Sequence, residues 1–306
     1  AQWRINQYTI TFDSQDGTVV NPITQDYGTA VTSPASPTKA GYTFDSWDPP
    51  VPATMPAEHT TCVAQWRINQ YTITFDSQDG TVVNSITQDY GTAVTAPAAP
   101  TKAGYTFDSW DPPVPQTMPA EHTTCVAQWR INQYTISFNT DGGTPSTIVD
   151  ITQDYGTAVT APAVPTKVGY TFTGWNPGVP TTMPAEHTTC VAQWRINQYT
   201  ISFNSDGGSA VDSITQDYNT AVTPPAAPTK TGYTFTGWNP LVPTTMPAEH
   251  TTCVAQWRID QYTISFNTDG GSAVDSITQD YNTAVTAPAA PTKAGYTFTG
   301  WDPPVP

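Results

Sequence analysis

The chain has 306 residues and a formal net charge of −15, with 10 Lys and Arg against 25 Asp and Glu. So few cations argue against nucleic acid as a partner, because phosphate binding needs clustered Lys and Arg. No apolar run approaches the ~20 residues that a membrane-crossing helix needs, so no membrane span is predicted in this chain. Thirty Pro and 20 Gly also argue against long helices.

The first predicted element is a short strand at residues 8–12, in which Tyr, Ile and Phe alternate with Thr. Residues 13–17 end in Asp-Gly, which is a strong signal for a turn between the strands of a hairpin. A second strand is expected near residues 23–31, running through Tyr27 with a bend at Gly28.

A proline-rich connection follows at residues 34–37. Residues 38–44 could hold one helical turn before Gly41 and a short extended piece after it. Residues 48–52 and 55–58 are predicted loops, because proline restricts the backbone and removes a hydrogen-bond donor.

The last strand of the module is predicted at residues 61–68, where one face carries Cys62, Ala64, Trp66 and Ile68. The alternation resumes at Tyr71, three residues after Ile68, so the apolar parity changes at residues 69–70. Such a change is expected where one strand ends and the next begins. Because no Gly, Pro or Ser spacer separates these strands, neighbouring modules should be joined stiffly.

The same order of elements recurs along the chain. Equivalent tryptophans are spaced 63 or 65 residues apart, as in Trp3, Trp66, Trp129, Trp194 and Trp257. A fixed interval of this size indicates a tandem array. The expected divisions are residues 1–6 (the end of a preceding module), 7–69, 70–132, 133–197, 198–260 and 261–306. Because the last module stops short of its final strand, we expect the chain to be a piece of a longer array.

Several blocks recur in a fixed order, namely Tyr-Thr-Ile-Thr-Phe-Asp, Asp-Tyr-Gly-Thr, Pro-Thr-Lys-Ala-Gly-Tyr-Thr-Phe, and Met-Pro-Ala-Glu ending in Ala-Gln-Trp. Over essentially the whole chain this pattern resembles the Listeria-Bacteroides repeat family, related to the B-repeat of internalin B. The resemblance implies tandem β-grasp-like modules of about 63 residues, mainly β with a small α+β form also open. It further implies stalk or adhesin regions of bacterial and archaeal surface proteins, and no catalytic residues.

Four cysteines occur, one in each complete module: Cys62, Cys125, Cys190 and Cys253. They stand where the family usually has an apolar residue such as Leu. Equivalent positions in successive modules should lie roughly 30 Å apart, whereas a disulfide needs Cα atoms within about 7 Å. A disulfide within the chain is therefore not expected. Each cysteine is a candidate buried thiol, because it shares a strand face with Ala and Trp, and an interchain crosslink is the alternative.

No catalytic, metal or cofactor site is predicted. His59 and Glu58 lie near Cys62, but together they supply fewer than the four ligands of a structural zinc site. A Cys–His nucleophile would also need an orienting group and a pocket. Residues 13–17 lack the spaced carboxylates and closing Glu of an EF-hand calcium loop.

Aromatic residues are the remaining candidates for ligand contact. Tyr27 and Tyr42 could form a sugar-stacking platform with the second tryptophan series, Trp47, Trp110, Trp175, Trp238 and Trp301. Core packing is the default interpretation of aromatics that recur in every module. The exposure of Trp47 and its copies distinguishes the two interpretations, because a buried Trp cannot form a platform for a sugar.

The sequence therefore predicts a non-catalytic structural repeat region of an extracellular or cell-surface protein or filament, as a stiff stalk or a polymer-forming array. The alternative is an adhesin whose repeats bind glycans or host proteins. Self-association into a filament or lateral bundle is also expected, because repeated equivalent surfaces allow regular contacts between chains.

Overall fold

The computed structural model describes all of residues 1–306. It contains strands, turns and loops and no helix, which confirms a mainly β fold in tandem modules of about 63 residues. The small α+β form is not adopted. By its internal contacts the chain divides into two compact units, Ala1–Ile136 with Ile151–Thr160 and Pro180–Thr188, and Ser137–Asp150 with Ala161–Val179 and Thr189–Pro306.

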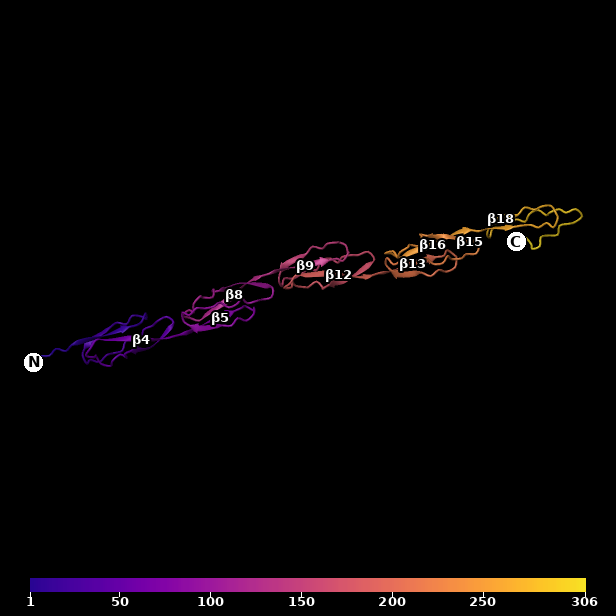
Figure 1. Cartoon of the computed structure of the whole chain (residues 1–306). Helices are drawn as coiled ribbons and strands as arrows, with labels where there is room; N and C mark the ends of the chain where they lie inside the picture. The colour runs from indigo at the N-terminus through magenta and orange to yellow at the C-terminus, as the bar shows by residue number, and fades with distance from the viewer. The chain divides into compact units, whose positions relative to one another are not determined.

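The strands repeat in a fixed order along the chain (Figure 1). We call each group of four consecutive strands a module. The groups are β1 (Gln7–Asp13), β2 (Ile23–Asp26), β3 (Tyr42–Asp48) and β4 (Thr60–Ile68); β5 (Gln70–Asp76), β6 (Ile86–Asp89), β7 (Tyr105–Asp111) and β8 (Thr123–Ile131); β9 (Gln133–Asn139), β10 (Ile151–Asp154), β11 (Tyr170–Asn176) and β12 (Thr188–Ile196); β13 (Gln198–Asn204), β14 (Ile214–Asp217), β15 (Tyr233–Asn239) and β16 (Thr251–Ile259). The fifth module has β17 (Gln261–Ile264) and β18 (Ile277–Asp280).

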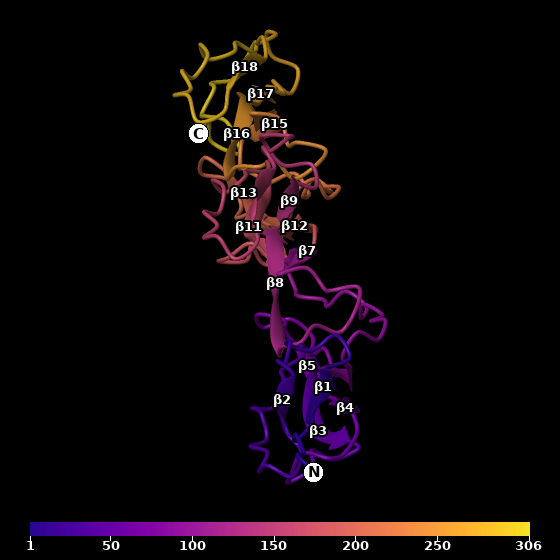
Figure 2. The ribbon, with the colours of Figure 1, turned by 90° about the vertical axis from the view of Figure 1, so that its left-hand side faces the viewer.

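The first module forms one mixed sheet in the order β2-β1-β4-β3 (Figure 2). Its outer pairs are antiparallel, and its central pair β1–β4 is parallel, with Ile10 opposite Thr60 and Asp13 opposite Val63. The second and fourth modules repeat this order and register. The third contains the antiparallel pairs β9–β10 and β11–β12, and the fifth the pair β17–β18. In the first, second and fourth modules, the first and last strands are thus neighbours in the sheet.

The core of the first module comes from three strands and one loop. Its buried residues are Ile10 of β1, Trp47 of β3, Cys62 and Ala64 of β4, and Met55 of the loop before β4. The backbone holds that loop in place, because Met55 donates its N–H to the carbonyl of Thr29 at 2.8 Å and accepts from Gly28 at 2.9 Å. A module of this size buries only about 60% of its unfolded surface, so this small core is marginal by itself.

The second strand is shorter than predicted. β2 ends at Asp26, where the chain turns: Thr29 donates its N–H to the carbonyl of Asp26 at 3.2 Å, and Gly28 has a φ of 77°. Tyr27 therefore lies outside the strand. In the later modules the tyrosine at this position contacts the preceding module, as described below, and does not extend the sheet.

The Asp-Gly segment turns as predicted, with Gly17 donating its N–H to the carbonyl of Ser14 at 2.9 Å. The connection is longer than a two-residue hairpin, however, because β1 ends at Asp13 and β2 begins at Ile23. β2 pairs with the first half of β1, where Gln7 lies opposite Asp26. The second half of β1 extends past it.

The segment before Gly41 forms a tight turn, and the predicted helical turn is wrong. Tyr42 donates its N–H to the carbonyl of Lys39 at 3.1 Å, and Gly41 has a φ of 79°. The Lys39 ammonium donates to the carbonyl of Gln15 at 2.7 Å and lies 4.8 Å from the centre of the Tyr42 ring. The turn is thus accompanied by a contact between Lys39 and a distant loop, and the local sequence cannot reveal that contact.

Candidate functional site: the module junction

A single residue joins one module to the next. Asn69 separates β4 from β5, and its N–H donates to the carbonyl of Gly41 at 2.9 Å while its carbonyl accepts from the N–H of Tyr90 at 2.9 Å. Its side chain accepts from Thr43 Oγ1 at 2.7 Å and donates to the Tyr71 hydroxyl at 3.4 Å. The backbone and the side chain of the linking residue are therefore both hydrogen-bonded to each of the two modules.

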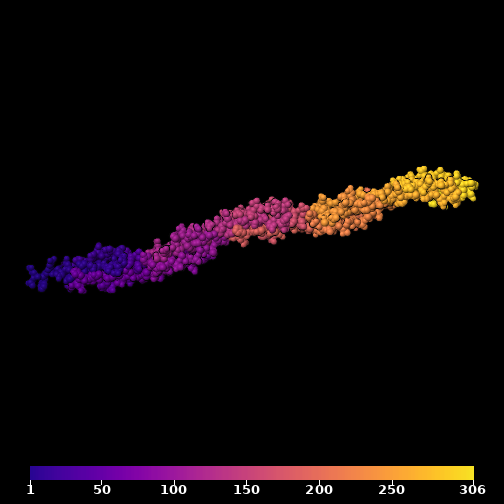
Figure 3. Space-filling view, turned by 45° about the horizontal axis from the view of Figure 1, so that its top comes forward, coloured from indigo at the N-terminus to yellow at the C-terminus, as the bar shows by residue number.

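The second module also contacts the first through Tyr90, which lies against Gly41. A Cβ atom on Gly41 would come within 2.1 Å of the Tyr90 ring, so no side chain fits there. The ring meets Tyr42 edge-on at 5.9 Å and Tyr71 at 6.5 Å between centroids, arrangements that aromatic pairs favour. Within the first unit, the surfaces of these two modules follow one another in chain order (Figure 3). Gly41 is needed both for its positive φ and for the room it leaves to Tyr90.

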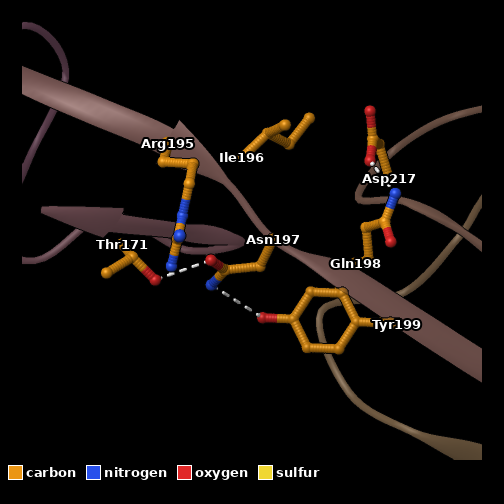
Figure 4. Close-up of a pocket in the computed structure, with 7 residues that line it drawn as sticks. All are labelled: Thr171, Arg195, Ile196, Asn197, Gln198, Tyr199 and Asp217. Atoms are coloured by element: carbon orange, nitrogen blue, oxygen red, sulfur yellow. Dashed lines mark hydrogen bonds between the residues drawn. The ribbon is translucent and has the colours of Figure 1, made fainter. Parts of the chain in front are cut away.

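The arrangement recurs at each later junction, and each lies within one of the two units. Figure 4 shows the third, where Asn197 accepts from Thr171 Oγ1 at 2.6 Å and donates to the Tyr199 hydroxyl at 3.5 Å. The glycine–tyrosine pairs of the later junctions are Gly104 with Tyr155, Gly169 with Tyr218, and Gly232 with Tyr281.

The fourth junction carries a natural substitution, since Asp260 stands where the others have Asn. Its carboxylate still accepts from Thr234 Oγ1. A carboxylate has no N–H to donate to a tyrosine hydroxyl. The fourth junction therefore keeps the bond from the threonine hydroxyl and lacks the amide donor.

A polar groove lies beside the junction. At the third junction it has a volume of about 540 Å³ and is lined by residues that include Arg195, Tyr199 and Asp217, with Gln198 Nε2 donating to Asp217 Oδ1 at 3.0 Å (Figure 4). The second and fourth junctions have equivalent grooves of about 560 and 690 Å³. Arginine, carboxylate, amide and hydroxyl groups line the groove, and no His or Cys does. Across the chain, no group of three or more His, Cys, Asp and Glu is placed to hold a metal ion.

The cysteines lie in the module cores and not at the junctions. All four are free, with side chains 0% exposed: Cys62, Cys125, Cys190 and Cys253. Cys62 of β4 stands opposite Phe12 of β1 in the parallel pair. Burial raises the pKa of each thiol above its ordinary value of 9.0, because desolvation penalises the thiolate. In the folded module each thiol is therefore buried and protonated near neutral pH.

The raised thiol pKa predicts a loss of stability in alkali. Above pH 9, an unfolded thiol ionises while a folded one keeps its proton, so the unfolded state binds fewer protons and stability falls as pH rises. Urea unfolding at pH 8 and pH 10 measures this fall. Replacing all four cysteines by Ala should reduce it, because the thiols that ionise in the unfolded chain are then absent. Equal falls in the two proteins would contradict the prediction.

The tryptophans of the second series pack into the modules. Trp47 and Trp238 are 9% and 8% exposed, and Trp110, Trp175 and Trp301 are half-buried. The Trp47 ring lies 5.0 Å from Phe12 and 5.3 Å from Phe44 between centroids. They present no fully exposed aromatic face. The copies of Tyr27 and Tyr42 instead meet one another at the junctions, a role that the sequence interpretation did not assign to them.

None of the chain's elements is a helix of the length and apolarity that a membrane crossing requires. Among proteins of known sequence, one named as a Gly-rich membrane protein of Evansella cellulosilytica is 33% identical over 343 residues, which covers 98% of this chain and 39% of that protein. Internalin H of Listeria monocytogenes is 40% identical over 144 residues, covering 44% of this chain and 25% of that protein. The chain thus spans well under half the length of these relatives.

Among solved structures, the chain matches domains 3–4 of the Streptococcal High Identity Repeats in Tandem (SHIRT) of a cell surface protein. The identity is 19% and the TM-score 0.18, over 41% of this chain and 98% of that one. The sequence profile of the Listeria-Bacteroides repeat domain matches five successive segments, residues 8–48, 71–111, 134–191, 199–250 and 262–302. These segments cover most of the chain and repeat in step with the strands, and the chain therefore belongs to the Listeria-Bacteroides repeat family.

Proposed function

We propose that this chain is a non-catalytic spacer in an extracellular bacterial surface protein, a stiff stalk that holds other parts of that protein away from the cell. The observation that carries the proposal is the junction, where one residue such as Asn69 links two modules and is hydrogen-bonded to both. The Tyr90 ring against Gly41 adds a second contact. Repeating such a junction limits the freedom of each module relative to the next.

The relatives support the location. Internalin H and the Evansella protein named as a membrane protein share these repeats, and family membership covers most of the chain. The junction grooves offer hydrogen-bonding groups without a nucleophile beside a base, which fits a structural role. We also propose that the modules divide at the linking residues, such as Asn69 and Asn132.

The filament and the adhesin both require a surface that a partner contacts. The tryptophans that would form a sugar platform are buried or half-buried, as Trp47 is. The thiols that would crosslink neighbouring chains are fully buried, as Cys62 is. A stalk requires neither group to be exposed, so it accords best with these positions.

The test places the 306-residue chain between a cell-wall anchor and a fluorescent head on a bacterial surface. The height of the head is measured by super-resolution microscopy. A Gly/Ser linker of equal length, whose root-mean-square span is about 100 Å, is the control. We expect the array to hold the head higher, with a narrower distribution of heights. Equal heights and widths for array and linker would overturn the proposal.

A further inference from the structure

Tension applied to the ends of the chain enters each module through its first strand and leaves through its last. In the first module these strands are β1 and β4, and Asn69 alone connects β4 to β5. The strands β2 and β3 stand at the outer edges of the sheet, in the order β2-β1-β4-β3. The central β1–β4 pair therefore separates the two points at which force acts.

The β1 and β4 strands are paired over only part of their lengths, and we call this paired part the overlap. Only Ile10–Asp13 of β1 and Thr60–Val63 of β4 are paired, in parallel. Because the strands point the same way, the pulled ends at Gln7 and Ile68 leave the overlap in opposite directions along the strands. The pull is thus roughly parallel to the strands, and the hydrogen bonds across the overlap resist it together. β5–β8 and β13–β16 have the same register.

Side chains reinforce the overlap on both sides. Thr11 Oγ1 lies 2.8 Å from Thr61 Oγ1, a hydrogen bond from β1 to β4. Before the paired residues, the Thr9 N–H donates to His59 Nδ1 at 3.1 Å. After them, Trp66 Nε1 donates to the carbonyl of Ser14 at 3.0 Å. All three bonds connect the segment around β1 to the segment around β4.

The histidine bond recurs in every complete module. The backbone N–H groups of Thr72, Thr135 and Thr200 donate to Nδ1 of His122, His187 and His250 at 3.0 to 3.1 Å. All four histidines of the chain therefore have this one position, where the imidazole accepts a bond from the first strand. The bond continues the ladder by one step beyond the overlap.

We propose that the first, second and fourth modules are tension-bearing elements, in which a pull along the chain shears the parallel pair of first and last strands. This goes beyond the spacer role, which needs length and stiffness but no resistance to pulling. The antiparallel pair β3–β4 lies off this path. A pull perpendicular to β3 and β4 breaks the hydrogen bonds between them one after another. The same module unfolds in both cases, so only the direction of the pull differs.

The experiment compares two pulling directions in the whole chain by single-molecule force spectroscopy. In the first, handles at the two ends of the chain load the parallel strand pairs of these modules in shear. In the second, handles on S46C and Q65C load only β3 and β4 of the first module; these residues are exposed and stand opposite each other. The native thiols are buried and do not compete for the handles.

We expect the end-to-end pull to rupture modules at a force several-fold higher than the sideways pull. Each end-to-end rupture should release about 60 residues, at most roughly 200 Å of chain. Forced unfolding reports the unfolding barrier in the pulled direction, so a difference between directions cannot come from overall stability. Equal rupture forces would overturn the tension-bearing role while leaving the stiff spacer intact.

Two matched variants test the overlap itself. Thr11→Val removes the side-chain bond from β1 to β4, whereas Thr9→Val removes the equivalent 2.9 Å bond from Thr9 to Thr24, from β1 to β2. Both changes delete one Thr–Thr bond on the exposed side of the same strand. Thr11→Val should lower the end-to-end rupture force of the first module, and Thr9→Val should leave it unchanged. The reverse result, or equal losses, would contradict the proposal.

Discussion

Replacing Gly41 by Ala should release the second module from the first. The new Cβ would lie 2.1 Å from the Tyr90 ring, and the ring is itself enclosed by Tyr42 and Tyr71. The positive φ of 79° adds about 1–2 kcal/mol of strain for a residue with a Cβ. Overpacking typically costs a further 1–3 kcal/mol, which displacement of Tyr90 from the junction would relieve.

The measurement is the distribution of distances between spin labels at Asp45 and Asp108, equivalent exposed positions of the first two modules. The unaltered junction should give one narrow distribution, and Gly41→Ala should broaden it. Both labels lie within the first unit. Urea unfolding of the same proteins shows whether the modules themselves stay folded.

Gly28 is the control that has the positive φ without the contact. Its φ is 77°, and a Cβ there would meet nothing within 4 Å. Gly28→Ala should therefore destabilise through backbone strain alone and leave the label distances narrow. If Gly41→Ala costs no more than Gly28→Ala, the Tyr90 contact does not hold the junction.

Local alternation explains what the sequence could predict. The apolar residues of β4 recur every second position up to Ile68, and the pattern restarts at Tyr71 in the other parity. Both facts are properties of one short stretch, so the strand end at Ile68 and the strand start at Gln70 could be inferred without knowing the fold. The prediction of a stiff connection rests on the absence of spacer residues at the same place, and it stays a prediction.

The junction contacts could not be inferred in this way, because their partners lie in different modules. Tyr27 and its copies continue the alternation of β2, so they favoured a longer strand. Tyr90 instead packs on Gly41, which precedes it by a large part of a module. Gly41 likewise follows a segment compatible with a helical turn, whereas its φ of 79° belongs to a tight turn and leaves room for Tyr90. One available signal was the recurrence of the pair at every complete junction.

A second large effect is expected from a substitution in the core of a single module. Replacing Met55 by Ala should unfold the first module while its neighbours stay folded. Met55 is 1% exposed and belongs to the same buried cluster as Cys62. Deleting a buried Met side chain costs about 2–5 kcal/mol. Domains have about 0.05–0.15 kcal/mol of stability per residue, or about 3–9 kcal/mol for a module of this size. The substitution therefore removes a large part of it.

The cysteines report which module has opened. Under mild urea, a maleimide followed by peptide mass spectrometry should label Cys62 in Met55→Ala and leave Cys125 protected, since Cys125 packs with Met118 in a separate cluster. Met118→Ala should move the label to Cys125. Met55→Leu, which nearly conserves volume and typically costs under about 1.5 kcal/mol, should leave Cys62 protected under the same conditions.

The pattern of labelling also decides how far the junction couples the modules. If Met55→Ala exposes Cys62 alone, each module unfolds by itself and the junction fixes orientation without sharing stability. If Cys125 is labelled as well, the contacts of Asn69 and Tyr90 transmit stability across the junction, and the prediction of independent modules is wrong. Combining Met55→Ala with Gly41→Ala distinguishes the two routes, because a loss of coupling in the double variant would place the transmission at the Tyr90 contact.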